Sequence, residues 1–144
     1  SASLISHTPE FPMATITAIR RQRQFEQMLG NLHELQQRFP KAFPVKDSEL
    51  VVSPLKINIA QDMVDALKGS ELELSLNQVH KVLQFWCSRR FYLKAFKTSS
   101  HRIDLAGEPF ELVTDTDREY AQKRRDAIDL QRAMMDPPFT PPLS

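Results

Sequence analysis

The sequence has little of several residues on which whole classes of protein depend. Its one cysteine, Cys87, excludes an intramolecular disulfide and a cysteine-rich zinc site, and it fits a reducing, cytoplasmic setting. Only three glycines occur, so there is no glycine-rich phosphate-binding loop, and the four histidines lack metal-ligand spacing. No apolar run approaches the ~20 residues of a membrane-spanning helix. We therefore expect no metal, no cofactor and no enzymatic activity.

The chain is long enough for one domain with its own core. It has 144 residues, of which 41% are hydrophobic. Residues 1–13 are polar and show no periodicity, and residues 136–144 contain four prolines, so both ends are expected to be disordered. The folded domain is predicted to span residues 14–135.

Apolar spacing predicts that the first half of this domain is helical. Apolar residues recur every three or four positions from about 14 to 39, and Pro40 follows. A second helix is predicted to start with Ser53 as N-cap and Pro54 as its first residue, and to stop before Gly69.

The second half combines helices with a short hairpin. A capping-box pattern begins at Ser75 and predicts a third helix, which breaks and restarts near Arg89. Residues 101–105 and 110–113 are predicted to form two strands joined by a turn. A last helix is predicted from Thr116, at another capping box, to about residue 135. The predicted fold is mainly α with a small β-hairpin.

Charge is distributed by region. Nineteen Lys and Arg against eighteen Asp and Glu give a net charge of +1. Residues 74–103 nevertheless hold six Lys or Arg and no acid, whereas residues 104–119 hold six acids and one base. Within the basic stretch, Arg90, Lys94 and Lys97 share one helix face, and Tyr92 lies within reach of it. A basic surface is therefore expected on one side only.

Three interpretations are compatible with a basic surface beside an aromatic ring. Cations that meet phosphates and a ring that stacks on a base are typical of RNA binding. The same residues could instead form a solvated face, with Tyr92 in the core, or a surface that docks an acidic protein.

DNA binding is disfavoured, because no helix-turn-helix spacing stands out. Ser75 and Asn77 open a helix, and helix starts attract phosphate, although every helix has one.

An ordered set of segments resembles the ProQ/FinO domain of bacterial RNA chaperones. The resemblance covers about residues 30–130. The segments that carry it are Pro54-Leu55-Lys56-Ile57, Leu74-Ser75 at a helix start, Arg90-Phe91-Tyr92-Leu93-Lys94, and His101-Arg102-Ile103-Asp104-Leu105-Ala106-Gly107.

The resemblance implies a single helical domain with a small hairpin and one concave, positively charged face. That face would bind the stem-loop of an intrinsic terminator and its single-stranded 3′ uridine tail. Such domains act with small regulatory RNAs, which they protect or help to pair with target messages. A cytoplasmic monomer is expected. The expected RNA-binding residues are Lys56, Ser75, Asn77, Arg90, Tyr92, Lys94, Lys97, His101 and Arg102.

Each matched residue has an expected role. Lys56 is predicted to lie in the first turn of a helix, where its charge would add to the helix dipole to hold phosphate. Tyr92 would offer its ring to the tail, and Arg102 would grip a phosphate with two hydrogen bonds. The alternative for Arg102 is a salt bridge within the protein, to Asp62 or Asp104.

The chain also departs from better-known members of the resembled family. The helix that follows Ser75 carries Leu76, His80 and Gln84 where such members often have basic residues. RNA binding on this helix is therefore expected to be weaker than in those members.

Overall fold

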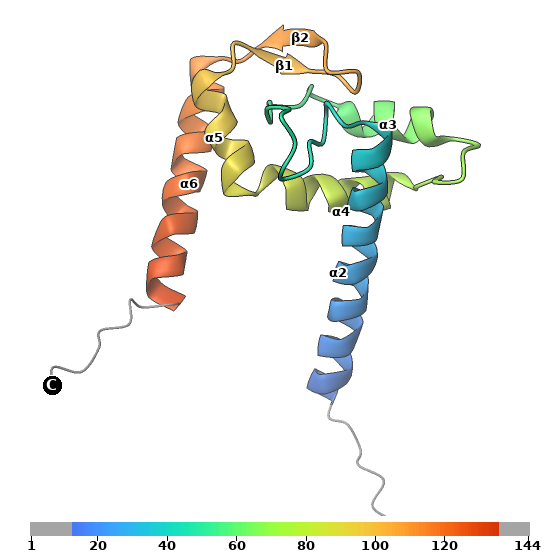
Figure 1. Ribbon diagram of the computed structural model, residues 1–144. Helices are drawn as coiled ribbons and strands as arrows, with labels where there is room; N and C mark the ends of the chain where they lie inside the picture. Colours follow the sequence, from blue (N-terminus) through green and yellow to red (C-terminus); the bar gives the residue numbers. More distant parts are fainter. Residues whose placement is uncertain (1–12, 136–144) are drawn as a thin grey trace, which may run out of the picture.

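The computed structural model describes residues 13–135 (Figure 1). Predictions for residues 1–12 and 136–144 lie outside the described residues. The elements, in chain order, are α2 (Met13–Arg38), α3 (Ile59–Leu67), α4 (Leu76–Cys87), α5 (Arg90–Thr98), β1 (His101–Ile103), β2 (Pro109–Leu112) and α6 (Asp115–Met135). The prediction of a mainly helical fold with one small hairpin is confirmed.

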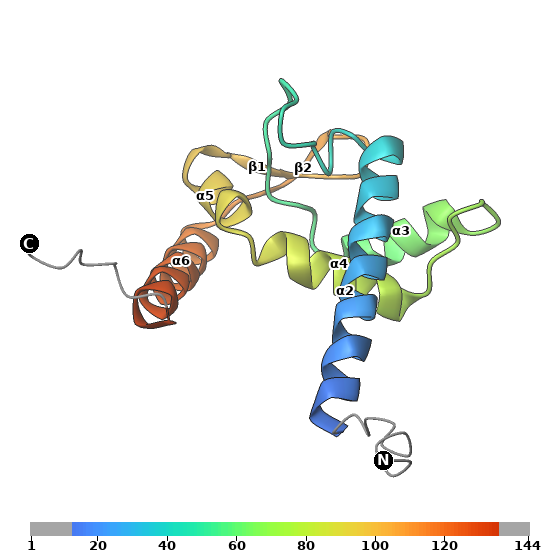
Figure 2. The same ribbon diagram turned by 60° about the horizontal axis from the view of Figure 1, so that its bottom comes forward.

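The two long helices lie apart in the molecule. Figures 1 and 2 show α2 crossing α4, with α5 and α6 on one side of α2 and α3 extending beyond its other side. α5 packs against α6, α3 against α4, and the hairpin crosses above α4 in the view of Figure 1. The described chain therefore starts and ends on the same side of the molecule.

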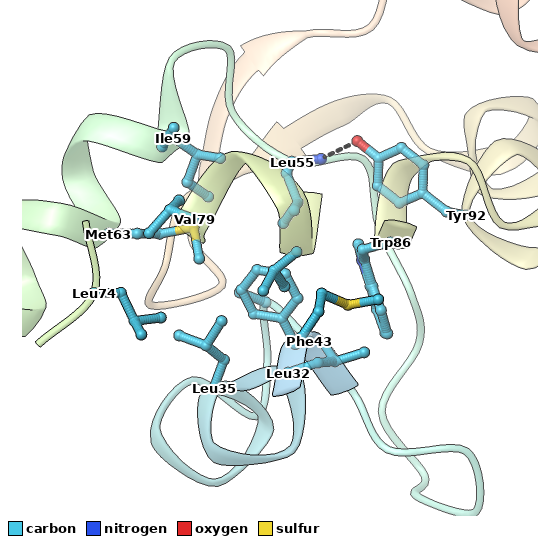
Figure 3. Close-up of a cluster of buried hydrophobic side chains, with 14 of the residues drawn as sticks. Leu32, Leu35, Phe43, Leu55, Ile59, Met63, Leu74, Val79, Trp86 and Tyr92 are labelled. Atoms are coloured by element: carbon cyan, nitrogen blue, oxygen red, sulfur yellow. Dashed lines mark hydrogen bonds between the residues drawn. The ribbon is translucent and has the colours of Figure 1, made fainter. Parts of the chain in front are cut away.

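One hydrophobic cluster joins α2, α3, α4 and the loop after α2 (Figure 3). Leu35, Phe43, Met63 and Val79 are fully buried in it. Trp86 of α4 packs its ring edge-on against Phe43, with the ring centroids 5.4 Å apart. Truncating an aromatic ring at such a site to alanine costs about 3–5 kcal/mol of stability. This cluster holds α4 in place beneath the loop that precedes α3.

The predicted start of the second helix is wrong by five residues. α3 begins at Ile59, because residues 54–56 pair with β1 instead of entering a helix. The backbone N–H of Ile103 donates to Pro54 O, and the N–H of Lys56 donates to Ile103 O, both at 2.8 Å. Asn58, at φ 67°, then turns the chain into α3 without a side-chain cap. A long-range pairing has thus overridden a local Ser–Pro helix signal.

The other caps are close to their predicted positions. Ser75 and Gln78 form the predicted capping box at the start of α4, and Gly69, at φ 77°, follows the end of α3. The last capping box is shifted by two residues, because Thr114 and Asp117 exchange the two hydrogen bonds that were predicted for Thr116 and Glu119. α6 consequently begins at Asp115.

The hairpin is short and irregular. His101 pairs with Leu112 and Ile103 with Pro109, with an irregularity between these pairs. In the turn, Gly107 has φ 82°, and a Cβ at this position would lie 2.7 Å from Lys41 Cβ. Only glycine fits such a site without strain. The hairpin is therefore set tightly against the loop that follows α2.

Candidate functional site

Two side chains from distant elements hold one peptide segment. The hydroxyl of Tyr92 in α5 accepts a hydrogen bond from the backbone N–H of Leu55 at 2.9 Å (Figure 3). Arg102 in β1 donates from Nη1 to the carbonyl of the same Leu55, also at 2.9 Å. Together with the pairing to Ile103, these bonds satisfy the backbone on both sides of Leu55. The orientation of the next residue, Lys56, is thereby fixed.

Lys56 lies at the edge of the segment and not in a helix. Its Nζ is 2.7 Å from Asp62 Oδ2 and 4.4 Å from the centroid of the Phe110 ring, and its side chain is 22% exposed. The prediction that Lys56 lies in the first turn of a helix, where its charge adds to the helix dipole, is therefore wrong. Its charge is instead held between a carboxylate of α3 and an aromatic face of β2, where an anion can still reach it.

Arg102 has a partner inside the protein, in keeping with the alternative considered for it. The partner is Asp117 of α6, with Nη2 to Oδ1 at 3.2 Å, rather than Asp62 or Asp104. The side chain is 13% exposed, and its buried Nε has no hydrogen-bond partner among the described residues. Desolvation raises the pKa of Asp117, but the hydrogen bond from the Thr114 N–H and the Arg102 charge outweigh it, so the net pKa is lowered.

Tyr92 is a core residue. Only 4% of it is exposed, and its ring packs edge-on against Phe96. The ring is therefore not a free stacking surface, and the hydroxyl is bonded to Leu55 rather than to solvent. Burial raises the pKa of the Tyr92 hydroxyl well above its usual value. Burial also raises the pKa of the neighbouring Cys87 thiol, to about 11, and this cysteine packs against the core.

These residues line two neighbouring depressions, which share part of their lining. The first, which we call the hollow, has a volume of about 300 Å³ and is lined by residues that include Lys56, His80, Cys87, Tyr92 and Arg102. The second, which we call the cleft, has about 660 Å³ and lies between α4, α5 and α6. Cys87, Tyr92 and Arg102 line both. The structure thus brings together Lys56, Tyr92 and Arg102, which lie far apart in the sequence.

The cleft contains two residues that the sequence analysis missed, Tyr120 and Arg124, together with Gln84, at which it expected weaker binding. Gln84 of α4 and Tyr120 and Arg124 of α6 line it, and Tyr120 is 64% exposed. Arg124 is exposed and forms no ion pair within residues 13–135. The spacing of Asp117, Tyr120 and Arg124 places all three on one helix face. The sequence therefore contained a pattern that could have predicted a Tyr–Arg face on this helix. The many acidic residues nearby made the segment look acidic, so the pattern was not noticed.

The other predicted residues lie outside the linings of the hollow and the cleft. Ser75 uses its hydroxyl to cap α4, and Asn77 is exposed one turn before His80 on the same helix. The hydroxyl of Ser100 lies 2.9 Å from Nδ1 of His101. Arg90 pairs with Asp129 at 2.9 Å.

Lys94 and Lys97 are exposed on α5, and neither forms an ion pair within the described residues. They share the exposed face of this helix with Arg90, as their spacing predicted. They line neither the hollow nor the cleft.

Within residues 13–135, no helix is both long and apolar enough to cross a membrane. No group of three or more His, Cys, Asp or Glu side chains in this range is placed to hold a metal ion.

The arrangement of helices and hairpin is that of solved ProQ/FinO-type structures. A ProQ homolog from Legionella pneumophila matches with a TM-score of 0.56 and 24% identity, over 81% of this chain and 90% of that chain. A FinO-like RNA chaperone from Neisseria meningitidis matches with a TM-score of 0.53 and 24% identity, over 67% of this chain and 92% of that one. A sequence profile of the ProQ/FINO family matches residues 25–136. The chain belongs to this family.

Proposed function

We propose that this protein is an RNA chaperone and has no catalytic role. It binds structured small regulatory RNAs at the terminator stem-loop and the single-stranded 3′ uridine tail, and it stabilises them and aids their pairing with target messages. We further propose that it acts as a monomer in the cytoplasm. The observation that carries the proposal is the convergence of Lys56, Tyr92 and Arg102 on one hollow, in a chain of this family.

The hollow supplies donors that suit an RNA phosphate. Lys56 and Arg102 both line it, and each holds a single carboxylate, Asp62 or Asp117, as its counter-ion. A phosphate that enters the hollow competes with these carboxylates for the two cations. Charge-assisted hydrogen bonds to phosphate are stronger than neutral ones, and the planar guanidinium can form two in parallel. The carboxylates keep the cations oriented when no RNA is bound.

The adjoining cleft supplies a surface for an unpaired nucleotide. Tyr120 is its exposed aromatic residue, and base–aromatic stacking contributes about 1–3 kcal/mol per base. Gln84 and Arg124 line the same cleft and provide an amide for a base edge and a cation for a phosphate. Tyr120 thereby takes the stacking role first expected of Tyr92. Tyr92 acts as a positioning residue, because it holds the peptide that precedes Lys56.

A titration with matched RNAs tests this function. The full chain is titrated against a labelled RNA hairpin that ends in a single-stranded 3′ uridine tail, and against the same hairpin without the tail. We expect the loss of the tail to weaken binding at least tenfold. Equal affinities would refute tail recognition. Absence of binding to both RNAs at low salt would refute the RNA function and favour an adaptor that docks an acidic protein.

A charge variant tests whether the hollow is the site. Lys56→Gln removes one phosphate contact, so it should weaken binding about three- to tenfold and reduce the slope of log affinity against log salt by about 0.7–0.9. Lys68→Gln is the matched control, because Lys68 is an exposed lysine after α3 that lines neither depression. Equal effects of the two variants would show that only overall charge matters.

A further inference from the structure

A third depression, outside the site described above, is rich in arginine. It has a volume of about 590 Å³ and lies where the start of α5 faces the second half of α6. Four arginines line it: Arg89, Arg90, Arg124 and Arg132. We call it the arginine groove. The basic residues come from two segments more than thirty positions apart, so the sequence alone does not show that they meet.

Most of the charge in this groove is uncompensated. Arg90 pairs with Asp129, whereas Arg89 lies over the ring of Phe85 at 4.3 Å and has no carboxylate partner in the described chain. Arg124 and Arg132 are exposed and form no ion pair within residues 13–135. Cations focused in a depression attract anions more strongly than isolated surface cations do. The groove is therefore suited to an anionic ligand with several charges.

The arginine groove adjoins the cleft. Ser88 and Arg124 line both, just as Cys87, Tyr92 and Arg102 join the cleft to the hollow. The three depressions thus lie next to one another in order, from the hollow to the end of α6. Along that helix Arg124 and Arg132 are eight residues apart, which is a rise of about 12 Å. One bound polyanion could occupy all three.

We propose that the arginine groove binds the sugar–phosphate backbone of the paired RNA stem that precedes the 3′ tail. This inference rests on the proposed function, in which the tail occupies the hollow and the cleft. The stem is the next part of the same RNA, and a duplex presents regularly spaced phosphates that guanidinium groups bind without reading sequence. The groove adds affinity and fixes the orientation of the stem on the protein, while recognition of the tail supplies the selectivity.

Two charge-matched double variants test the groove. Arg89→Gln with Arg132→Gln removes two cations that line the groove and neither the hollow nor the cleft, whereas Arg20→Gln with Lys123→Gln removes two exposed cations that line none of the three depressions. With the tailed hairpin, the groove variant should lose at least tenfold in affinity, and its salt slope should flatten by about 1.4–1.8. The control variant should lose less than threefold. Circular dichroism should show the same helix content for both.

A tail-only RNA separates the groove from the hollow. A short uridine oligonucleotide fills only the hollow and the cleft, so Arg132→Gln alone should leave its affinity unchanged and should weaken the tailed hairpin about three- to tenfold. Equal loss for both RNAs would overturn the assignment of the stem to the groove, as would equal loss in the two double variants. If the unaltered chain binds neither RNA, the proposed function itself fails, and an acidic protein becomes the candidate ligand of the groove.

Discussion

Removing the hydroxyl of Tyr92 tests how the candidate site is built. Tyr92→Phe keeps the buried ring but removes the acceptor for the Leu55 N–H, which lies 2.9 Å away, and Leu55 is only 2% exposed. A buried donor left without a partner costs about 1–3 kcal/mol. Tyr92→Ala would also remove the ring and would cost about 3–5 kcal/mol. We expect Tyr92→Phe to lower the free energy of unfolding by about 2 kcal/mol, with the denaturant slope unchanged.

The assay is urea unfolding followed by Trp86 fluorescence and by circular dichroism. RNA titration then shows whether Tyr92 acts through Lys56. In a double-mutant cycle, Tyr92→Phe and Lys56→Gln should be non-additive for RNA affinity, because both disturb the same contact. Unchanged stability of Tyr92→Phe would refute the role of its hydrogen bond. Additive losses in the cycle would show that the hydroxyl contacts RNA directly.

Three further predictions concern buried or paired groups. Because the pKa of Asp117 is lowered in the folded state, Asp117 contributes stability above the unfolded-state pKa of about 3.9, and this contribution is lost as the pH falls through the folded-state pKa. The free energy of unfolding of Asp117→Asn should therefore depend less steeply on pH below about 4 than that of the unaltered chain, and equal pH profiles would contradict this. Because the pKa of Cys87 is raised to about 11, iodoacetamide should label it at pH 8 more than tenfold more slowly than a free thiol, as followed by mass spectrometry; rapid labelling would mean that the thiol is not buried. Arg125 is 6% exposed; its Nη2 donates to Gln122 Oε1, but its Nε has no partner within residues 13–135 and no carboxylate there neutralises its charge. Arg125→Met should therefore raise the free energy of unfolding by about 1 kcal/mol in urea, and a loss of stability would show that the bond to Gln122 compensates for the buried charge.

Local signals predicted most of the fold. The apolar spacing of α2 and the capping box at Ser75 are properties of contiguous residues, and the structure has both. The start of α3 could not be predicted in this way. Ser53 and Pro54 suit a helix start, but the backbone of Pro54 bonds to Ile103, almost fifty residues later. Pairing over such a distance leaves no trace in a window of local sequence.

The sequence analysis identified three residues of the candidate site but not how they are arranged in space. Lys56, Tyr92 and Arg102 were found through a resemblance, and the structure places all three at the hollow. Tyr92 shares an i, i+4 face with the core residue Phe96, which was the available signal that its ring is buried. Asp117 could not be identified as the partner of Arg102, because nothing in the sequence distinguishes it from the other acids of that block.

The hydrogen bonds of Tyr92 and Arg102 to Leu55 have a consequence for the synthesis of the chain. Lys56 is synthesised before the groups that orient its segment, which belong to Tyr92, Arg102 and Ile103. Contacts between positions so far apart form late, since the intervening chain must first be made and closed into a loop. A nascent chain that ends before β1 can form helices but cannot assemble the hollow. The hollow is therefore expected to form only after β1 has been made.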